Sequence, residues 1–180
     1  MTLVLASTSP QRRAILDQLR IPFEVVAPQY VEEPGGDPVA HAAGKARSIT
    51  AGERPVLGVD TVVVCDREVI GKPADEDDAD RMLALLSGRA HDVVSGLCLR
   101  TDSWEELHAE TTRVVFRPLT ATDRRRYLES GEWQGRAGAY AIQGFGANLV
   151  ERVDGDYLNV VGLPGALLIR LLAVRCSDGQ

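Results

Sequence analysis

The stretch RPVLGVDTVVVCD, residues 54–66, decides what kind of protein this sequence encodes. It is an almost uninterrupted run of apolar and β-branched residues, which is typical of a strand buried on both faces. Asp60 interrupts the run, and burying an ionised carboxylate without partners is costly in free energy. The stretch therefore predicts a central strand whose one carboxylate is compensated by a cation or by hydrogen-bond donors.

Helical and extended patterns alternate on both sides of this strand. Apolar spacing, capping residues and turn signals predict strands at 2–6, 22–27, 68–70, 91–100, 106–117, 147–152 and 157–161, and helices at 10–20, 38–50, 75–88, 122–129 and from 164 onward. We find no repeat and no linker. The pattern predicts one mixed α/β domain over residues 1–180.

Composition limits the classes of function. The chain has 180 residues, of which 44% are hydrophobic and 26% charged, as in ordinary globular proteins. No segment has the length of apolar sequence that a membrane span needs, and no secretory leader is evident. Three widely separated cysteines favour a reducing cytoplasm. The net charge of −6 argues against a polymeric nucleic acid as partner, but not against a small anion held by local cations.

The segment ASTSPQRR, residues 6–13, follows the first strand and has the features of an anion site. Ser9 suits the cap of a helix, and the first amides of that helix lack partners. Arg12 and Arg13 are misplaced there unless an anion is present, because a helix N-terminus is already positive. A phosphate would make both arginines favourable, and Ser7 could add a hydroxyl donor. The alternative is an ordinary cap with arginines in solvent.

Other charged residues have two interpretations each. Asp60 suits a divalent metal, which prefers oxygen ligands, or the early end of a strand. Lys72, in the rigid segment GKP, is either a phosphate clamp or a turn lysine. Glu32 and Glu33 could supply a second metal carboxylate, but taken alone they favour a solvated pair. Lys45 taken alone favours a surface position on its helix.

The glycine-rich segment GRAGAYAIQGFG, residues 135–146, contains neither a dinucleotide fingerprint nor a Walker loop. Its glycines suggest a backbone that approaches a ligand closely. Gln143 within it carries both a donor and an acceptor and is suited to the edge of a nucleobase.

Taken together, these segments are far more specific than any one of them. The chain contains, in order, LASTSPQRR, VEE, GKA, GVDTVVV, GKP, LSGRAHDVVSG, AGAYAIQGFGANLV and GDYLNVVGLP. From about Leu3 to Pro164 it resembles the Maf family of nucleoside triphosphate pyrophosphatases. The resemblance implies an α/β fold like that of inosine-triphosphate pyrophosphatases, with a long mixed sheet, flanking helices and two lobes around a cleft. It also implies hydrolysis of a nucleoside triphosphate to monophosphate and diphosphate, in the cytoplasm, by a homodimer.

The resemblance also implies roles for individual residues. The family's functional positions fall on Asp60 as proton acceptor, on the acidic loop residue Glu33, on Lys45 and Lys72, and on Ser7, Ser9 and Arg12. We expect Mg²⁺ or Mn²⁺ to be held by Glu33 and Asp60, and the arginine pair Arg12 and Arg13 to face the triphosphate. Whether Asp60 is base, metal ligand or both stays open.

The chain departs from the family pattern at Gln11, where the family has arginine. The positions tied to base choice in the dTTP/UTP branch would be Gln11, Thr61 and Gln143, and two of the three match. We therefore expect a lean toward dTTP and UTP. The spacing of the arginine pair also occurs in the branch that acts on 7-methyl-GTP. Further alternatives are an ITP pyrophosphatase and a non-catalytic nucleotide-binding regulator of septum formation.

Overall fold

The computed structural model describes residues 2–33, 35–50 and 52–177, and seven strands in these ranges form one mixed sheet. The strands are β1 (Leu3–Ala6), β2 (Phe23–Val26), β3 (Val56–Cys65), β4 (Glu68–Ile70), β5 (Ala90–Arg100), β6 (Glu105–Phe116) and β7 (Val150–Asp154). The helices are α1 (Pro10–Gln18), α2 (Pro38–Arg47), α3 (Glu76–Leu86), α4 (Ala121–Glu129), α5 (Tyr157–Val161) and α6 (Gly165–Ser177), with 3₁₀ turns η1 (Ala137–Ala139) and η2 (Gly144–Leu149). No helix in these ranges has the length and apolar character needed to cross a membrane.

The sheet has the order β2-β1-β3-β5-β6-β7, with β4 paired to β3. β1 runs parallel to β2 and β3, whereas β3, β5, β6 and β7 are antiparallel to their neighbours. The predicted mixed α/β fold is confirmed. The prediction of a strand buried on both faces holds for 56–60, which is buried throughout, but residues 61, 62 and 64 are half-buried. Thr61 and Val63 in this second half line a pocket.

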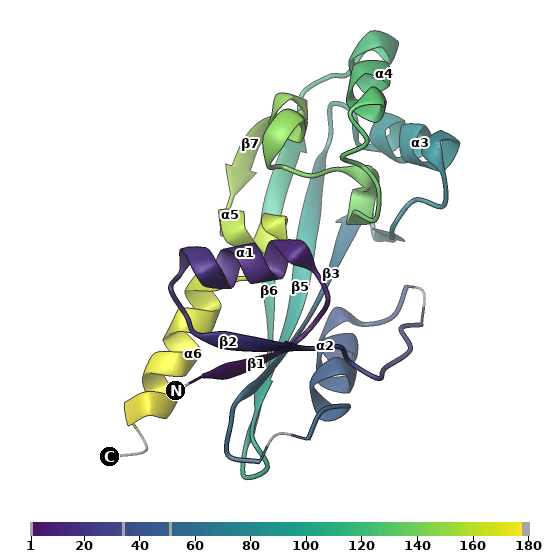
Figure 1. Cartoon of the computed structure of the whole chain (residues 1–180). Helices are drawn as coiled ribbons and strands as arrows, with labels where there is room; N and C mark the ends of the chain where they lie inside the picture. The colour runs from purple at the N-terminus through teal and green to yellow at the C-terminus, as the bar shows by residue number, and fades with distance from the viewer. Residues whose placement is uncertain (1, 34, 51, 178–180) are drawn as a thin grey trace.

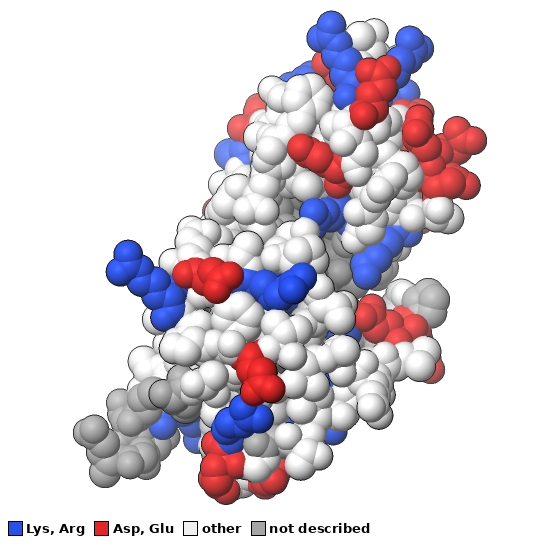
Figure 2. Space-filling model, in the orientation of Figure 1, with Lys and Arg blue, Asp and Glu red and all other residues white. Residues whose placement is uncertain are grey.

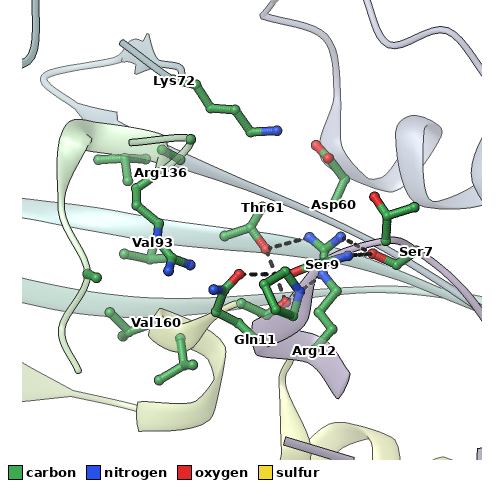
Figure 3. Close-up of a pocket in the computed structure, with 18 of the residues that line it drawn as sticks. Ser7, Ser9, Gln11, Arg12, Asp60, Thr61, Lys72, Val93, Arg136 and Val160 are labelled. Carbon is green, nitrogen blue, oxygen red and sulfur yellow. Dashed lines mark hydrogen bonds between the residues drawn. The ribbon is translucent and has the colours of Figure 1, made fainter. Parts of the chain in front are cut away.

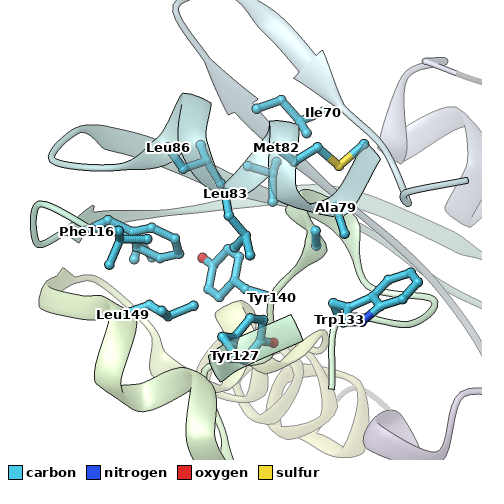
Figure 4. Close-up of a cluster of buried hydrophobic side chains, with 14 of the residues drawn as sticks. Ile70, Ala79, Met82, Leu83, Leu86, Phe116, Tyr127, Trp133, Tyr140 and Leu149 are labelled. Atoms are coloured by element: carbon cyan, nitrogen blue, oxygen red, sulfur yellow. The ribbon is translucent and has the colours of Figure 1, made fainter. Parts of the chain in front are cut away.

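The long strands join two lobes that have separate hydrophobic cores (Figure 1). In the lower lobe of the figure, α1 and α6 pack on one face of the sheet and α2 on the other. In the upper lobe, α3, α4 and the glycine-rich segment surround an aromatic cluster that contains Phe116, Tyr127, Trp133 and Tyr140 (Figure 4). This is the two-lobed architecture that the resemblance implies.

Residues 157–161 form a helix, so the predicted strand there is wrong. The side chain of Asp156 accepts a hydrogen bond from the backbone amide of Leu158 at 2.8 Å, which caps α5. Gly162, with a φ of 129°, ends it. The buried Asn159 amide donates to the carbonyl of Val93 at 3.0 Å and so fastens α5 to β5. The helix cap, the terminating glycine and the tertiary hydrogen bond together outweigh the preference of the β-branched residues for a strand.

Boundaries elsewhere shift by a few residues. The strand predicted from 147 begins at Val150, because η2 occupies the residues before it. The helix predicted to reach residue 50 ends at Arg47. Asp37 and Asp75 cap α2 and α3, since both side chains accept hydrogen bonds from amides in the first turn of their helices.

Candidate active site

A cavity of about 310 Å³ lies where the two lobes meet (Figure 3). It is bordered by the β1–α1 turn, α2, β3, β5, the glycine-rich segment and α5. Its lining comprises Ala6–Arg12, Pro28, Glu32, Lys45, Asp60, Thr61, Val63, Lys72, Val93, Gly135–Ala137, Tyr140–Gln143 and Val160–Gly162. Segments far apart in the sequence therefore build one site.

Arg12 is held in a fixed orientation at one side of the cavity. Its Nε donates to the carbonyl oxygen of Gly162 at 2.9 Å, and Nη1 donates to Ser7 Oγ at 3.2 Å. Nη2 donates to Thr61 Oγ1 at 3.4 Å, and that hydroxyl lies 2.9 Å from Ser95 Oγ. Burial lowers the pKa of Arg12, while the carboxylates of Asp60 and Glu32 act in the opposite direction. The guanidinium is thus oriented before any anion arrives.

Ser9 occupies the N-cap position of α1, but its side chain does not cap the helix. Its hydroxyl donates to Gln11 Oε1 at 3.0 Å instead. The expected cap interaction is therefore wrong, and the first amides of α1 keep the anion-binding potential of a helix N-terminus.

Asp60 and Lys45 form a buried ion pair beside Arg12. Lys45 Nζ lies 2.6 Å from Asp60 Oδ1, and the two side chains are 6% and 10% exposed. The ammonium also donates to the carbonyl oxygen of Val59 at 3.3 Å and lies 2.8 Å from Glu32 Oε1. Asp60 thus has the compensating cation that its place in an apolar strand requires. The surface position favoured for Lys45 by its sequence context is wrong.

Glu32 completes this group from the loop before α2. Partial burial alone would raise the pKa of Glu32, but the hydrogen bond from Lys45 and the charges of Lys45, Lys72 and Arg12 outweigh burial and lower it. We call Arg12, Glu32, Lys45, Asp60 and Lys72 the charged wall. Figure 2 shows basic side chains at the level where the lobes meet.

The opposite side of the cavity has a different character. We call residues 135–143 the loop wall; Arg136, Tyr140 and Gln143 are among its lining residues. Val93 and Val160 lie on this side in Figure 3, away from Asp60 and Lys72. With Arg136 the cavity has four cations against two carboxylates, a positive excess in a chain of net charge −6. Such a cavity suits a ligand with an anionic part and a flat, less polar part.

The structure brings together most of the residues that the sequence singled out. Those in the lining are Ser7, Ser9, Arg12, Lys45, Asp60, Thr61, Lys72 and Gln143. Arg13 and Glu33 are exposed and do not belong to it. Because Arg12 and Arg13 are adjacent on a helix, their side chains diverge, and only Arg12 turns inward. Glu32, which the sequence had grouped with Glu33 as a solvated pair, is the glutamate that reaches Lys45.

Sequence reasoning missed the contribution of α5. Val160 and Gly162 line the cavity, and the carbonyl of Gly162 orients Arg12. The sequence does contain a signal for this helix. Asp156 is suited to cap it and Gly162 to end it, with five residues between them.

The donor set is suitable for a hard cation that shares a substrate's phosphates. In the described ranges no three His, Cys, Asp or Glu residues are grouped as a metal cage. Asp60 and Glu32 nevertheless face one cavity, and Asp60 Oδ2 has no hydrogen-bond partner among the described residues. Mg²⁺ in nucleotide sites is commonly bound by one or two carboxylates together with phosphates and water. The residues present fit that pattern.

Comparison with known proteins agrees with the resemblance. The sequence model of a family described as "Maf-like protein" matches residues 2–175. The chain belongs to the Maf family. Curated relatives of this Maf protein are named dTTP/UTP pyrophosphatase. The protein from Syntrophomonas wolfei is 42% identical over 97% of each chain, and that from Moorella thermoacetica is 44% identical over 98% of this chain and 96% of the relative.

Among solved structures, the Maf chain aligns with the Ham1 protein of Staphylococcus aureus. The alignment has a TM-score of 0.43 at 11% identity and covers 64% of this chain and 72% of the other.

Proposed function

We propose that this Maf protein hydrolyses nucleoside triphosphates to monophosphate and diphosphate, with a preference for dTTP and UTP. The observation that carries the proposal is the charged wall, which places a buried carboxylate, Asp60, among cations in a cavity large enough for a nucleotide. The curated relatives with more than 40% identity, named dTTP/UTP pyrophosphatase, support it.

The reaction needs water to attack the α-phosphorus while diphosphate leaves with growing negative charge. Arg12, Lys45 and Lys72 are suited to stabilise that charge, as preorganised donors do in other hydrolases. Arg12 needs no reorientation, because Gly162, Ser7 and Thr61 already hold its guanidinium. Arg136 adds a fourth cation from the loop wall.

Asp60 is suited to accept the proton of the attacking water. Its Oδ1 is occupied by Lys45, which leaves Oδ2 to face the substrate. Proton transfer by a positioned carboxylate typically accelerates a reaction by about 10²- to 10⁴-fold. Oδ1 of Asp60 then anchors Lys45, while Oδ2 is available both to take the proton and to bind a metal ion.

We propose that Mg²⁺ or Mn²⁺ is held by Asp60 and Glu32. Such an ion supplies charge neutralisation on the phosphates and lowers the pKa of bound water. The sequence assigned the second carboxylate to Glu33. That assignment stays a prediction, and Glu32 is the better placed alternative because it lies in the lining and Glu33 does not.

We propose that the loop wall receives the base. Gln143 offers a donor and an acceptor to the edge of a pyrimidine, and Thr61 is at hydrogen-bond distance from Arg12. Gln11 stands where the family has arginine, and its Oε1 is occupied by Ser9. The preference for pyrimidines therefore depends chiefly on the loop wall.

The decisive experiment is product analysis with the purified protein. dTTP, UTP, CTP, GTP, ITP and 7-methyl-GTP are incubated separately with Mg²⁺ or Mn²⁺, and phosphorus NMR separates diphosphate from phosphate. We expect diphosphate and monophosphate, released fastest from dTTP or UTP. Phosphate with nucleoside diphosphate would refute cleavage between the α- and β-phosphates. Tight binding without any product would favour a regulator of septum formation.

We further propose, from the family resemblance alone, that the protein acts in the cytoplasm as a homodimer. Light scattering at several protein concentrations tests the oligomeric state, and a monomeric mass throughout would refute the dimer.

A further inference from the structure

The loop wall continues into residues 144–146, and its backbone is held by side chains that do not line the cavity. Ala141 donates its amide to Tyr127 Oη at 2.9 Å, and His91 Nε2 lies 2.9 Å from Tyr140 Oη. Tyr127 comes from α4 and His91 from β5. The base-facing segment is thus fixed from behind.

Glu132 provides the most direct of these attachments. Its Oε1 accepts a hydrogen bond from the amide of Phe145 at 3.0 Å, and its Oε2 accepts one from the amide of Gly146 at 3.1 Å. One carboxylate therefore satisfies two successive amides just after Gln143. Hydrogen bonds to a charged acceptor are stronger than those between neutral groups.

The backbone is shaped to receive this carboxylate. Gly144 has a φ of +68°, which favours glycine, and a Cβ at this position would lie 2.6 Å from Glu132 Oε1. A Cβ on Gly146 would lie 1.8 Å from the carbonyl oxygen of Ala141. The segment therefore folds back on itself, and a side chain at position 144 would collide with the carboxylate.

The aromatic side chains behind the segment support the same arrangement. The Tyr127 ring is stacked on Phe145, with 6.5 Å between centroids and 9° between planes. Tyr127 and Tyr140 belong to the buried cluster of the upper lobe (Figure 4). Burial raises the pKa of Tyr127 to about 12, so its phenol stays protonated.

We propose that Glu132 is a positioning residue for base selection, a role that rests on the proposed function. It fixes the backbone that carries Gln143 and touches neither the phosphates nor the reacting atoms. Loss of its two hydrogen bonds lets the Gln143 segment move, which weakens binding of the base. Arg12, Glu32, Lys45 and Asp60 of the charged wall are unaffected, because none of their hydrogen bonds or ion pairs includes residues 132–146.

The test compares Glu132→Gln with Glu129→Gln. Both variants remove one negative charge near the end of α4, but Glu129 is exposed and touches no part of the loop wall. For E132Q we expect KM for UTP to rise about fivefold, equivalent to about 1 kcal/mol. We expect kcat to change by less than about threefold and the ratio of kcat/KM for UTP over CTP to fall. E129Q should match the wild type.

A second variant covers the case in which E132Q is too unstable to assay. Gly144→Ala keeps the carboxylate but pushes a methyl group against it, so the same rise in KM and loss of selectivity are expected. A merely structural role would lower the melting temperature without changing the ratio between nucleotides.

Binding is also measured without turnover, by calorimetric titration with a UTP analogue whose α–β bridge is a methylene group. An unchanged dissociation constant in E132Q, or an equal loss of kcat for every nucleotide, would overturn the positioning role. A wild type that binds the analogue but cleaves no nucleotide would refute the proposed function. The role of Glu132 would then be decided by comparing the dissociation constants of the wild type and E132Q. Absence of all nucleotide binding would overturn both.

Discussion

The charged wall and the loop wall keep their shapes by different means. In the charged wall the side chains that line the cavity hold one another: Lys45 pairs with Asp60 and Glu32 within the cavity itself. In the loop wall Gln143, which we propose contacts the base, has no side-chain hydrogen bond in the described part of the chain, and the backbone around it is held by residues outside the cavity. Changes in the charged wall should therefore reduce kcat, whereas changes behind the loop wall should alter KM and selectivity.

The largest expected effect is that of Asp60→Asn. An amide accepts the proton poorly and no longer balances the charge of Lys45, so we expect kcat to fall by about 10³-fold. Diphosphate release from UTP measures it. Asp92→Asn, a half-buried carboxylate on β5 outside the cavity, is the control and should keep wild-type rates. Activity within threefold of wild type in D60N would remove Asp60 from the mechanism.

The next effect concerns pH and the support of the loop wall. Burial lowers the pKa of His91 to about 4, whereas the unfolded chain takes up that proton near pH 6.5. The unfolded state therefore binds more protons between these values. The contribution of neutral His91 to the free energy of unfolding is therefore fully present above pH 6.5. It falls by about 3 kcal/mol as the pH is lowered toward 4.

Denaturant unfolding of wild type, His91→Gln and the control His108→Gln between pH 7 and 4 measures this loss. H91Q should lose less stability than wild type across that range, and H108Q should follow the wild type. Parallel curves for all three proteins would show that His91 is not responsible.

A smaller effect separates the two adjacent glutamates. Glu32→Gln removes a carboxylate from the charged wall and should lower kcat by about tenfold and raise the Mg²⁺ concentration needed for half activity. Glu33→Gln changes an exposed residue outside the cavity and should stay within about twofold of wild type. Steady-state rates over a Mg²⁺ series measure both. The reverse order would restore the assignment of the metal to Glu33.

The smallest effect is expected for Gln143→Ala. One lost hydrogen bond to the base should raise KM for UTP by about fivefold and leave kcat nearly unchanged. Gln134→Ala, at an exposed position outside the cavity, is the control. A fall in kcat with constant KM would place Gln143 beside the reacting phosphate and end the contrast between the walls.

The same contrast explains what the sequence could predict. Asp60 stands out because a carboxylate in an apolar strand demands a partner, and the strand–turn–helix pattern around Arg12 indicates an anion site. Both features are local. The partner of Asp60 is not local, because Lys45 lies on helix α2 and Asp60 on strand β3. The sequence around Lys45 resembles that of any exposed helix face.

The contacts that hold the loop wall could not be predicted from the sequence, because they too join residues that are distant in the chain. Glu132 lies 13 residues from Phe145, and nothing between them signals that a side chain caps backbone amides there. The error at 157–161 also has a physical cause, since five residues are too few for helical periodicity to outweigh their β-branched composition. The two glutamates differ only in the direction of their side chains, which the fold decides.

The hydrogen bond between Arg12 and Gly162 joins residues 150 positions apart in the chain. During synthesis β1 and α1 precede this contact, because the carbonyl that orients Arg12 is made 150 residues after Arg12 itself. Leu163 and Leu168 then pack against Leu3 and Leu5 in the same core cluster. Contacts of such range make folding slow relative to helix formation. A nascent or truncated chain therefore lacks an ordered anion site, and nucleotide binding begins only when the carboxyl-terminal segment has closed the lower lobe.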